Sequence, residues 1–155
     1  MNFLNTTIGL ASDHTGFEYK ELIKKFLEKR GLRHVDFGAY STERSDYTDF
    51  AHEIGKAIES GELEMGIALC GTGNGMAITL NKYQSIRAGL AWNEEIAKLV
   101  SAHNKANMLV IPARFTTEDE VIKIVEAYLD TPFEEGRHLE RINKITPAPP
   151  VDGCF

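Results

Sequence analysis

The chain has 155 residues, of which 43% are hydrophobic, and it carries a formal net charge of -6 at pH 7. This length is enough for one globular domain with a buried core, so we expect residues 1–155 to form a single domain. The acidic balance argues against nucleic acid and anionic membranes as partners, because both attract basic surfaces. No segment approaches the ~20 consecutive apolar residues of a membrane-spanning helix and no targeting leader is recognisable, so we expect a cytoplasmic protein.

Cysteine usage is sparse. The two cysteines are Cys70, which follows an apolar run, and Cys154, near the C-terminus. This pattern does not make a disulfide framework, and a reducing compartment is the expected setting. Cys70 is therefore expected to carry a free thiol.

Apolar runs alternate with helical patterns along the first half of the chain. They predict, in order, a strand at residues 7–12, a helix from about 17 to 30, a short strand around 34–37, a polar stretch at 38–48 and a helix that ends near Gly61. The first helix is indicated by apolar residues one turn apart, such as Ile23 and Leu27, and by Gly31 directly after it.

The second half continues the alternation. It predicts a strand at 65–69, a helix from 74 to about 81, a strand at 86–91, a helix from 94 to about 103, a strand at 108–111 and a helix from the capping region at 116–120 to Asp130. A short helix around 136–141 follows, and the proline-rich residues 147–155 are expected to form an extended tail. The pattern predicts an α/β fold, a three-layer α/β/α sandwich around a five-stranded parallel sheet of the Rossmann or flavodoxin-like kind.

The segment 66–77 combines a buried strand, a thiol and a glycine-rich turn. The strand runs into Cys70, and the loop that follows, Gly71-Thr72-Gly73-Asn74-Gly75, opens a helix. This places several backbone N–H groups and the positive end of a helix dipole beside one sulfur. The arrangement suits chemistry on an anion.

Other reactive side chains follow the predicted strands. In open α/β sheets ligands bind beyond the carboxyl ends of the strands, at the point where the strand order reverses. Asp13 and His14 follow the first strand and Cys70 follows the third, and these strands flank the expected reversal. We therefore expect the three groups to converge on one crevice.

His103 does not fit that crevice. It closes the helix at 94–103, and a crossover helix runs antiparallel to its strands, so His103 should lie at the opposite edge of the sheet. Unless His103 is structural, it must serve a site of a neighbouring subunit, which predicts a dimer with shared active sites. Arg137 and Arg141, four residues apart on one helix face, suit a phosphate or carboxylate, although spacing alone favours the interpretation that they only complement the acidic Glu134-Glu135 beside them.

These residues resemble those of the ribose-5-phosphate isomerase B family, which also contains the galactose-6-phosphate and allose-6-phosphate isomerases. The resemblance covers nearly the whole chain up to about Ile145. The motifs that carry it are 12–17 (SDHTGF), Asp46-Tyr47, 70–75 (CGTGNG), Asn81-Lys82 with 86–88 (IRA), His103-Asn104 with Ala106-Asn107, and 136–138 (GRH) with Arg141.

The resemblance implies interconversion of an aldose phosphate and its ketose through an enediolate, without metal or cofactor. Ribose 5-phosphate and ribulose 5-phosphate are the substrates of first choice. The alternatives are isomerisation of a six-carbon sugar phosphate, such as allose 6-phosphate or galactose 6-phosphate, and a non-catalytic phosphate-binding module in which Cys70 only packs. A homodimer is expected, and a tetramer is left open.

The resemblance also implies roles for individual residues. Cys70 matches the base, and a helix N-terminus is expected to lower the pKa of its thiol. Thr72 matches an assisting group, Asp13 a partner on the anomeric hydroxyl, and His103 the ring-opening acid supplied across the dimer. The remaining matches are sugar contacts at Tyr47 and Asn104, enediolate-stabilising amides at Gly71, Gly73, Asn74 and Gly75, and a phosphate clamp of His14, Arg137 and Arg141.

Three alternative assignments compete with these roles: a different base, a dinucleotide site and a metal site. One branch of the family has a glutamate as base where this chain has Met76, so that duty stays with Cys70. A dinucleotide site is disfavoured, because the glycine spacing is short and no acidic residue follows about 20 positions on. Asp13, His14 and His103 suggest a metal, but no HxxxH or comparable spacing supports one.

Overall fold

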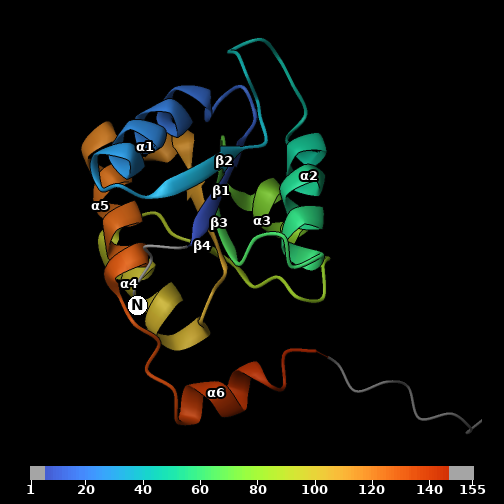
Figure 1. Ribbon diagram of the computed structural model, residues 1–155, viewed down its shortest axis with the longest axis vertical. Helices are drawn as coiled ribbons and strands as arrows, with labels where there is room; N and C mark the ends of the chain where they lie inside the picture. The colour runs from blue at the N-terminus through green and yellow to red at the C-terminus, as the bar shows by residue number, and fades with distance from the viewer. Residues whose placement is uncertain (1–5, 147–155) are drawn as a thin grey trace, which may run out of the picture.

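The computed structural model describes residues 6–146, and the predicted tail at 147–155 lies outside them (Figure 1). The five strands are β1 (Thr7–Ser12), β2 (Arg33–Asp36), β3 (Met65–Cys70), β4 (Ala88–Leu90) and β5 (Met108–Pro112). The helices are α1 (Phe17–Lys29), α2 (Tyr47–Glu59), α3 (Asn74–Leu80), α4 (Glu94–Asn104), α5 (Glu118–Asp130) and α6 (Arg137–Ile142), with a 3-10 turn, η2, at Ala113–Phe115. All strand pairs are parallel, in the order β2-β1-β3-β5-β4.

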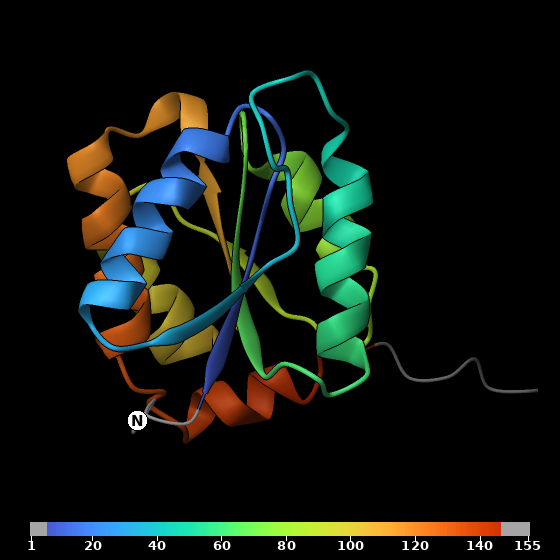
Figure 2. The ribbon, with the colours of Figure 1, turned by 45° about the horizontal axis from the view of Figure 1, so that its top comes forward.

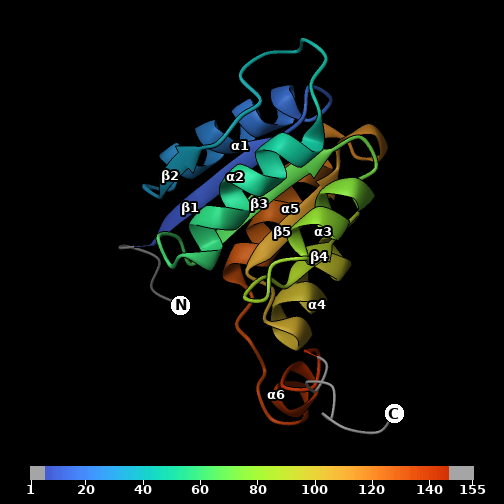
Figure 3. The ribbon, with the colours of Figure 1, turned by 90° about the vertical axis from the view of Figure 1, so that its right-hand side faces the viewer.

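Helices cover both faces of the sheet, which confirms the predicted three-layer sandwich (Figures 1 and 3). Helices α2 and α3 pack on one face and α1, α4 and α5 on the other. Strand side chains alternate between the two layers, so that Leu10 packs with the α1 and α5 layer while its neighbour Ala11 packs with α2 and α3. Helix α6 extends beneath the end of α4 (Figures 1 and 2).

The predicted elements are all present, with shifted ends. Strand β2 begins one residue earlier than expected, and α2 begins at Tyr47, inside the stretch predicted to be polar loop. The predicted strand at 86–91 shortens to Ala88–Leu90. Before its start, the Arg87 N–H donates to the Asn107 side-chain oxygen rather than to a neighbouring strand. Within residues 6–146, no helix is long and apolar enough to cross a bilayer.

The strand order reverses between β1 and β3, as predicted. Strand β2 pairs with one edge of β1, and β3 pairs with the opposite edge of β1. The register aligns Ser12 with Leu69, and the N–H of Asp13 donates to the carbonyl of Leu69 at 3.2 Å. Asp13, which follows β1, and Cys70, the last residue of β3, therefore lie side by side.

A buried ion pair fixes the loop that follows β2. The Lys20 side chain on α1 is fully buried, and its Nζ lies 2.5 Å from Asp36 Oδ1. Lys24 Nζ donates to Asp36 Oδ2 at 3.0 Å, and the Gly38 N–H donates to Oδ1 at 2.9 Å. Burial alone would raise the pKa of Asp36, but these hydrogen bonds and the lysine charges outweigh it and hold the pKa below its usual value. Asp36 thus anchors the start of the loop at 38–46.

We predict that Asp36→Asn lowers the free energy of unfolding at pH 7 by about 2–3 kcal/mol, because it leaves a buried lysine charge without its close partner. The native pKa of Asp36 is depressed, so its contribution is present above the unfolded carboxyl pKa and is lost as the pH falls through the native value. Urea unfolding at several pH values checks this, and the difference between native and variant protein should shrink below about pH 4.

Glu53→Gln is the matched control, because it removes a carboxylate from the exposed Lys56–Glu53 pair. It should cost less than about 0.5 kcal/mol. A loss in Asp36→Asn no larger than in this control would contradict the anchoring role.

Candidate functional site

Cys70 lies at the centre of the site, at the end of β3. Its side chain is buried among the α2 and α3 layer, with 4% exposure. Gly73, at φ 75°, forms the left-handed turn that begins α3. This turn directs the backbone N–H groups of Met76, Gly73 and Thr72 at the Cys70 sulfur. The local geometry is the amide cradle that the sequence predicts.

The expected lowering of the Cys70 pKa is wrong, because the pKa is raised above its ordinary value. Burial is the largest influence and raises the pKa, and the negative charge of Asp13 raises it further. The three backbone hydrogen bonds act in the opposite direction but do not outweigh the loss of hydration. The sequence places the helix N-terminus correctly but does not reveal how deeply the sulfur is buried.

We predict that Cys70 reacts slowly with iodoacetamide at pH 7.5, with a rate constant at least about tenfold below that of glutathione, because little thiolate is present and the sulfur is buried. The rate should keep rising as the pH passes 9.0, the ordinary value for a thiol. Mass spectrometry of Cys154→Ser protein, which leaves Cys70 as the reporting thiol, measures this. A rate that levels off near neutral pH would contradict the raised pKa.

Asp13 is held rigidly beside the thiol. Its Oδ1 accepts hydrogen bonds from the Thr15 N–H at 2.9 Å, the Thr15 hydroxyl at 2.5 Å and the Gly16 N–H at 3.2 Å. Asp13 is buried, and its charge acts on Cys70. One carboxylate oxygen therefore orients the group, which leaves Oδ2 for a ligand.

The loop at 38–46 projects beyond this end of the sheet, between β2 and α2 (Figure 1). The Ser45 hydroxyl accepts from the His14 N–H at 3.1 Å, and His14 Nδ1 lies 3.2 Å from the Ser45 carbonyl. At the end of the loop, the Tyr47 ring packs flat on Gly75, where an added Cβ would lie 2.5 Å from the ring. Tyr47 therefore contacts the glycine loop, and His14 contacts the loop at 38–46 that leads to Tyr47.

Arg114 also belongs to this end of the site, although the site residues chosen from the sequence do not include it. It follows β5, whose last residue Pro112 pairs with Cys70. The Arg114 N–H donates to the Gly71 carbonyl at 3.0 Å, and its guanidinium lies over Gly71. The sequence feature that could have identified Arg114 is its position directly after the end of a predicted strand. That position brings an exposed cation to the glycine loop.

The remaining predicted residues gather elsewhere, at the end of α4 and on α6. A hollow of about 310 Å³ is lined by His103, Asn104, His138, Arg141, Ile142 and Ile145. The rings of His103 and His138 stack at 4.1 Å, with 8° between their planes. Burial, the charge on His103 and the charge of Arg137 lower the pKa of His138. Within residues 6–146, neither Arg137 nor Arg141 forms an ion pair with an acidic side chain.

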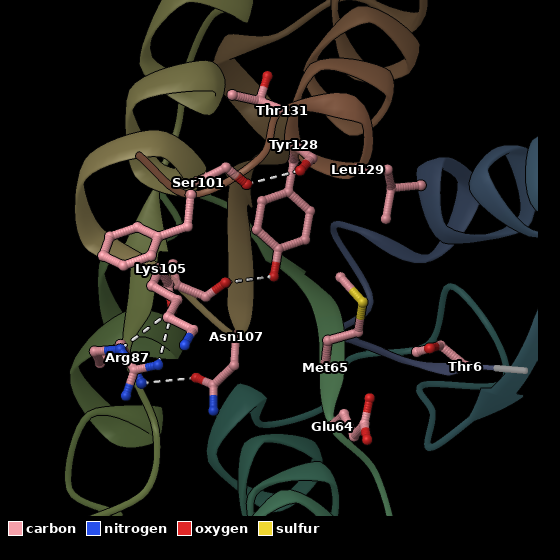
Figure 4. A pocket seen from close by; sticks show the side chains of 12 residues that line it. Thr6, Glu64, Met65, Arg87, Ser101, Lys105, Asn107, Tyr128, Leu129 and Thr131 are labelled. Atoms are coloured by element: carbon pink, nitrogen blue, oxygen red, sulfur yellow. Dashed lines mark hydrogen bonds between the residues drawn. The ribbon is translucent and has the colours of Figure 1, made fainter. Parts of the chain in front are cut away.

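A polar network holds the end of α4 in place, beside a cavity of about 470 Å³ (Figure 4). The Arg87 guanidinium donates to the carbonyls of Asn104 and Lys105, and the Tyr128 hydroxyl donates to the Ala106 carbonyl. Burial raises the pKa of Tyr128. Arg87, Ser101, Asn107 and Tyr128 are engaged in hydrogen bonds here, so we interpret the network as support for His103 and Asn104 rather than as a reactive site.

The two groups of residues lie at opposite ends of the sheet. Cys70 follows the carboxyl end of β3, whereas α4 ends where β5 is about to begin, at the amino edge (Figure 3). The structure thus brings together Asp13, His14, Tyr47, Cys70, Gly71, Thr72, Gly73, Asn74 and Gly75, and separately His103, Asn104, Arg137 and Arg141. This confirms the prediction that, in a single chain, His103 lies at the opposite edge of the sheet from the Cys70 thiol.

The fold, a parallel α/β sandwich, and the site, the Cys70 thiol beside the glycine loop at 71–75, together define the class of protein to which this chain is compared. The family model described as Ribose/Galactose Isomerase matches residues 8–145. Ribose-5-phosphate isomerase B of Escherichia coli (strain K12) is 37% identical over 139 residues, which cover 90% of this chain and 93% of that protein. The chain therefore belongs to the ribose/galactose isomerase family, as a sugar-phosphate isomerase of the ribose-5-phosphate isomerase B kind.

Solved structures agree with this assignment. A ribose 5-phosphate isomerase from Thermotoga maritima is 44% identical, with a TM-score of 0.87 and coverage of 90% of this chain and 97% of that one. The ribose-5-phosphate isomerase B of Mycoplasma genitalium, solved with bound ribulose-5-phosphate, is 38% identical, with a TM-score of 0.87 and coverage of 91% and 94%.

Proposed function

We propose that the protein interconverts ribose 5-phosphate and ribulose 5-phosphate, an intramolecular oxidation and reduction, with Cys70 as the base and without metal. The observation that carries this proposal is the buried Cys70 thiol beside Asp13, under backbone N–H groups of a helix-opening glycine loop. The bound ribulose-5-phosphate in the Mycoplasma genitalium relative supports a five-carbon substrate.

The proton moves between neighbouring carbons. His103 of a partner subunit and Asp13 assist opening of the sugar ring at the anomeric hydroxyl, and Thr72 lies beside the reacting carbons. The Cys70 thiolate takes the proton from C2, the electron pair moves to the C1 oxygen, and an enediolate forms. The hydroxyl proton on the C2 oxygen then passes to the C1 oxygen, the thiol returns its proton to C1, and C2 becomes the carbonyl carbon of the ketose. The loop amides from Gly71 to Gly75 stabilise the developing oxyanion, which is the largest contribution expected from the protein.

The raised pKa of Cys70 sets a condition on this step. The thiol is the resting form, so turnover requires an ionised fraction that grows with pH. The amides directed at the sulfur keep that fraction accessible, since they already lower the pKa against the effect of burial. We therefore expect kcat/KM to rise with pH on the side where Cys70 ionises.

The phosphate is proposed to bind between two chains. His14 and Arg114 supply positive or hydrogen-bonding groups at the Cys70 end, and Arg137 and Arg141 supply guanidinium groups at the α6 end. Because the two ends are separated in one chain, the arginines complete the site of a partner in a homodimer, or in a tetramer built from such dimers. Asn104 reaches the sugar from the same partner, and Tyr47 reaches it from the Cys70 side.

A six-carbon sugar phosphate is the second candidate. The loop at 38–46 and Tyr47 bound the space beyond the glycine loop, and both are firmly held, by Asp36 and by contact with Gly75. Higher kcat/KM for allose 6-phosphate than for ribose 5-phosphate would reverse the preference.

We predict that Cys70→Ala lowers kcat for ribose 5-phosphate roughly 10²–10⁴-fold, with KM changed much less, because the base acts in proton transfer and not in phosphate binding. Ketose formation in the presence of EDTA, together with exchange of the C2 hydrogen with deuterated solvent, measures this. Cys154→Ala is the matched control and should retain native rates. Absence of turnover in native protein would contradict the proposed reaction, and native rates in Cys70→Ala would contradict the role of the thiol.

A further inference from the structure

Three side chains at the junction of α4 and α6 form a cluster that the sequence does not reveal. His103 comes from the last turn of α4, Glu134 from the segment before α6, and His138 from the first turn of α6. His103 Nε2 and His138 Nε2 each lie 3.6 Å from Glu134 Oε2, and the three donor atoms all lie within 4.8 Å of one another. Two imidazoles and one carboxylate are the donor set of an open zinc site.

The backbone holds the three residues in this arrangement. The Glu134 N–H donates to the Ala102 carbonyl at 2.9 Å, which fixes the segment before α6 against the end of α4. The His138 side chain is buried, with 8% exposure, and its N–H donates to the Glu135 carbonyl. Little chain entropy therefore remains to be lost when a ligand draws the donors together.

From these contacts we propose that His103, Glu134 and His138 bind one divalent transition-metal ion with the preferences of Zn²⁺. Tetrahedral zinc with nitrogen and oxygen ligands at about 2.0–2.2 Å places those ligands about 3.4 Å apart. The two carboxylate distances are already close to this value. The rings are nearly parallel, so one must turn to aim its lone pair at the ion, and His103, with 35% side-chain exposure, has room to do so.

The charges around the cluster limit the affinity. Glu134 contributes one negative charge, but the positive charges of Arg137 and Arg141 act on His138 from the same helix. Three protein ligands and these cations make binding weaker than in closed four-ligand sites. The open fourth position suits water or a phosphate oxygen.

Binding of Zn²⁺ has a consequence for the reaction, which rests on the proposed role of His103. The ion would occupy the imidazole nitrogen that is proposed to open the sugar ring, and it would lie among the residues proposed to hold the phosphate. Zn²⁺ therefore acts here as a reversible inhibitor and not as a cofactor.

We predict that calorimetric titration of Zn²⁺ into the full chain, in a non-chelating buffer at pH 7.5, shows one ion bound per chain. Glu134→Gln and His138→Gln should each weaken this binding at least about tenfold, because each removes one of three ligands. His52→Gln is the matched control. His52 is an exposed histidine on α2, hydrogen-bonded to Tyr83, and its loss should leave the affinity unchanged. Glu134 is exposed, so its substitution should not disturb folding.

Binding with Co²⁺ in place of Zn²⁺ adds a spectroscopic readout. Histidine and carboxylate ligands should give visible bands without a thiolate charge-transfer band. No saturable binding, binding in Glu134→Gln and His138→Gln as tight as in native protein, or a thiolate band would overturn the site.

In the activity measurement, turnover should fall over the same Zn²⁺ range and return with EDTA. Full turnover at saturating Zn²⁺ would overturn the inhibition, and a protein without isomerase activity would still be judged by the binding measurement.

Discussion

The backbone register between β1 and β3 decides what this protein can do. One hydrogen bond, from the Asp13 N–H to the Leu69 carbonyl, continues the ladder past the end of β1 and sets the carboxylate beside the thiol of Cys70. Side chains alternate with a period of two along a strand, so a slip of one residue would turn the Cys70 side chain from the α3 layer to the opposite face. The thiol would then lose the amides of the glycine loop.

The same topology separates the two groups of polar residues. In a parallel sheet every crossover helix begins near the carboxyl edge and ends near the amino edge, so His103 at the end of α4 lies far from the loop after β3. A hydrogen-bond network around the half-buried Arg87 and the added helix α6 nevertheless position that second group. In the proposed function, a site assembled from two copies of the chain uses both groups of residues.

The sequence predicts the fold well, because the apolar periodicity and the capping residues act locally. Thr117 and Glu120 form the expected capping box at the start of α5, and β1 has the predicted bounds. Burial and contacts between distant segments are not local, and there the prediction fails. The pKa of Cys70 rises because of neighbours that the motif does not show. Likewise Glu134 meets His103 only through the packing of α6 on α4.

The central claim is that Cys70 of one chain works with His103 of another, and subunit complementation tests it most directly. Cys70→Ala and His103→Ala proteins, each with little turnover alone, are mixed under conditions that exchange subunits, and mass spectrometry verifies the mixed assemblies. Random pairing restores one intact site in half of the dimers, so about a quarter of native activity should return. Mixed dimers that stay as inactive as their parents would show that each site is built from a single chain, and would contradict the account.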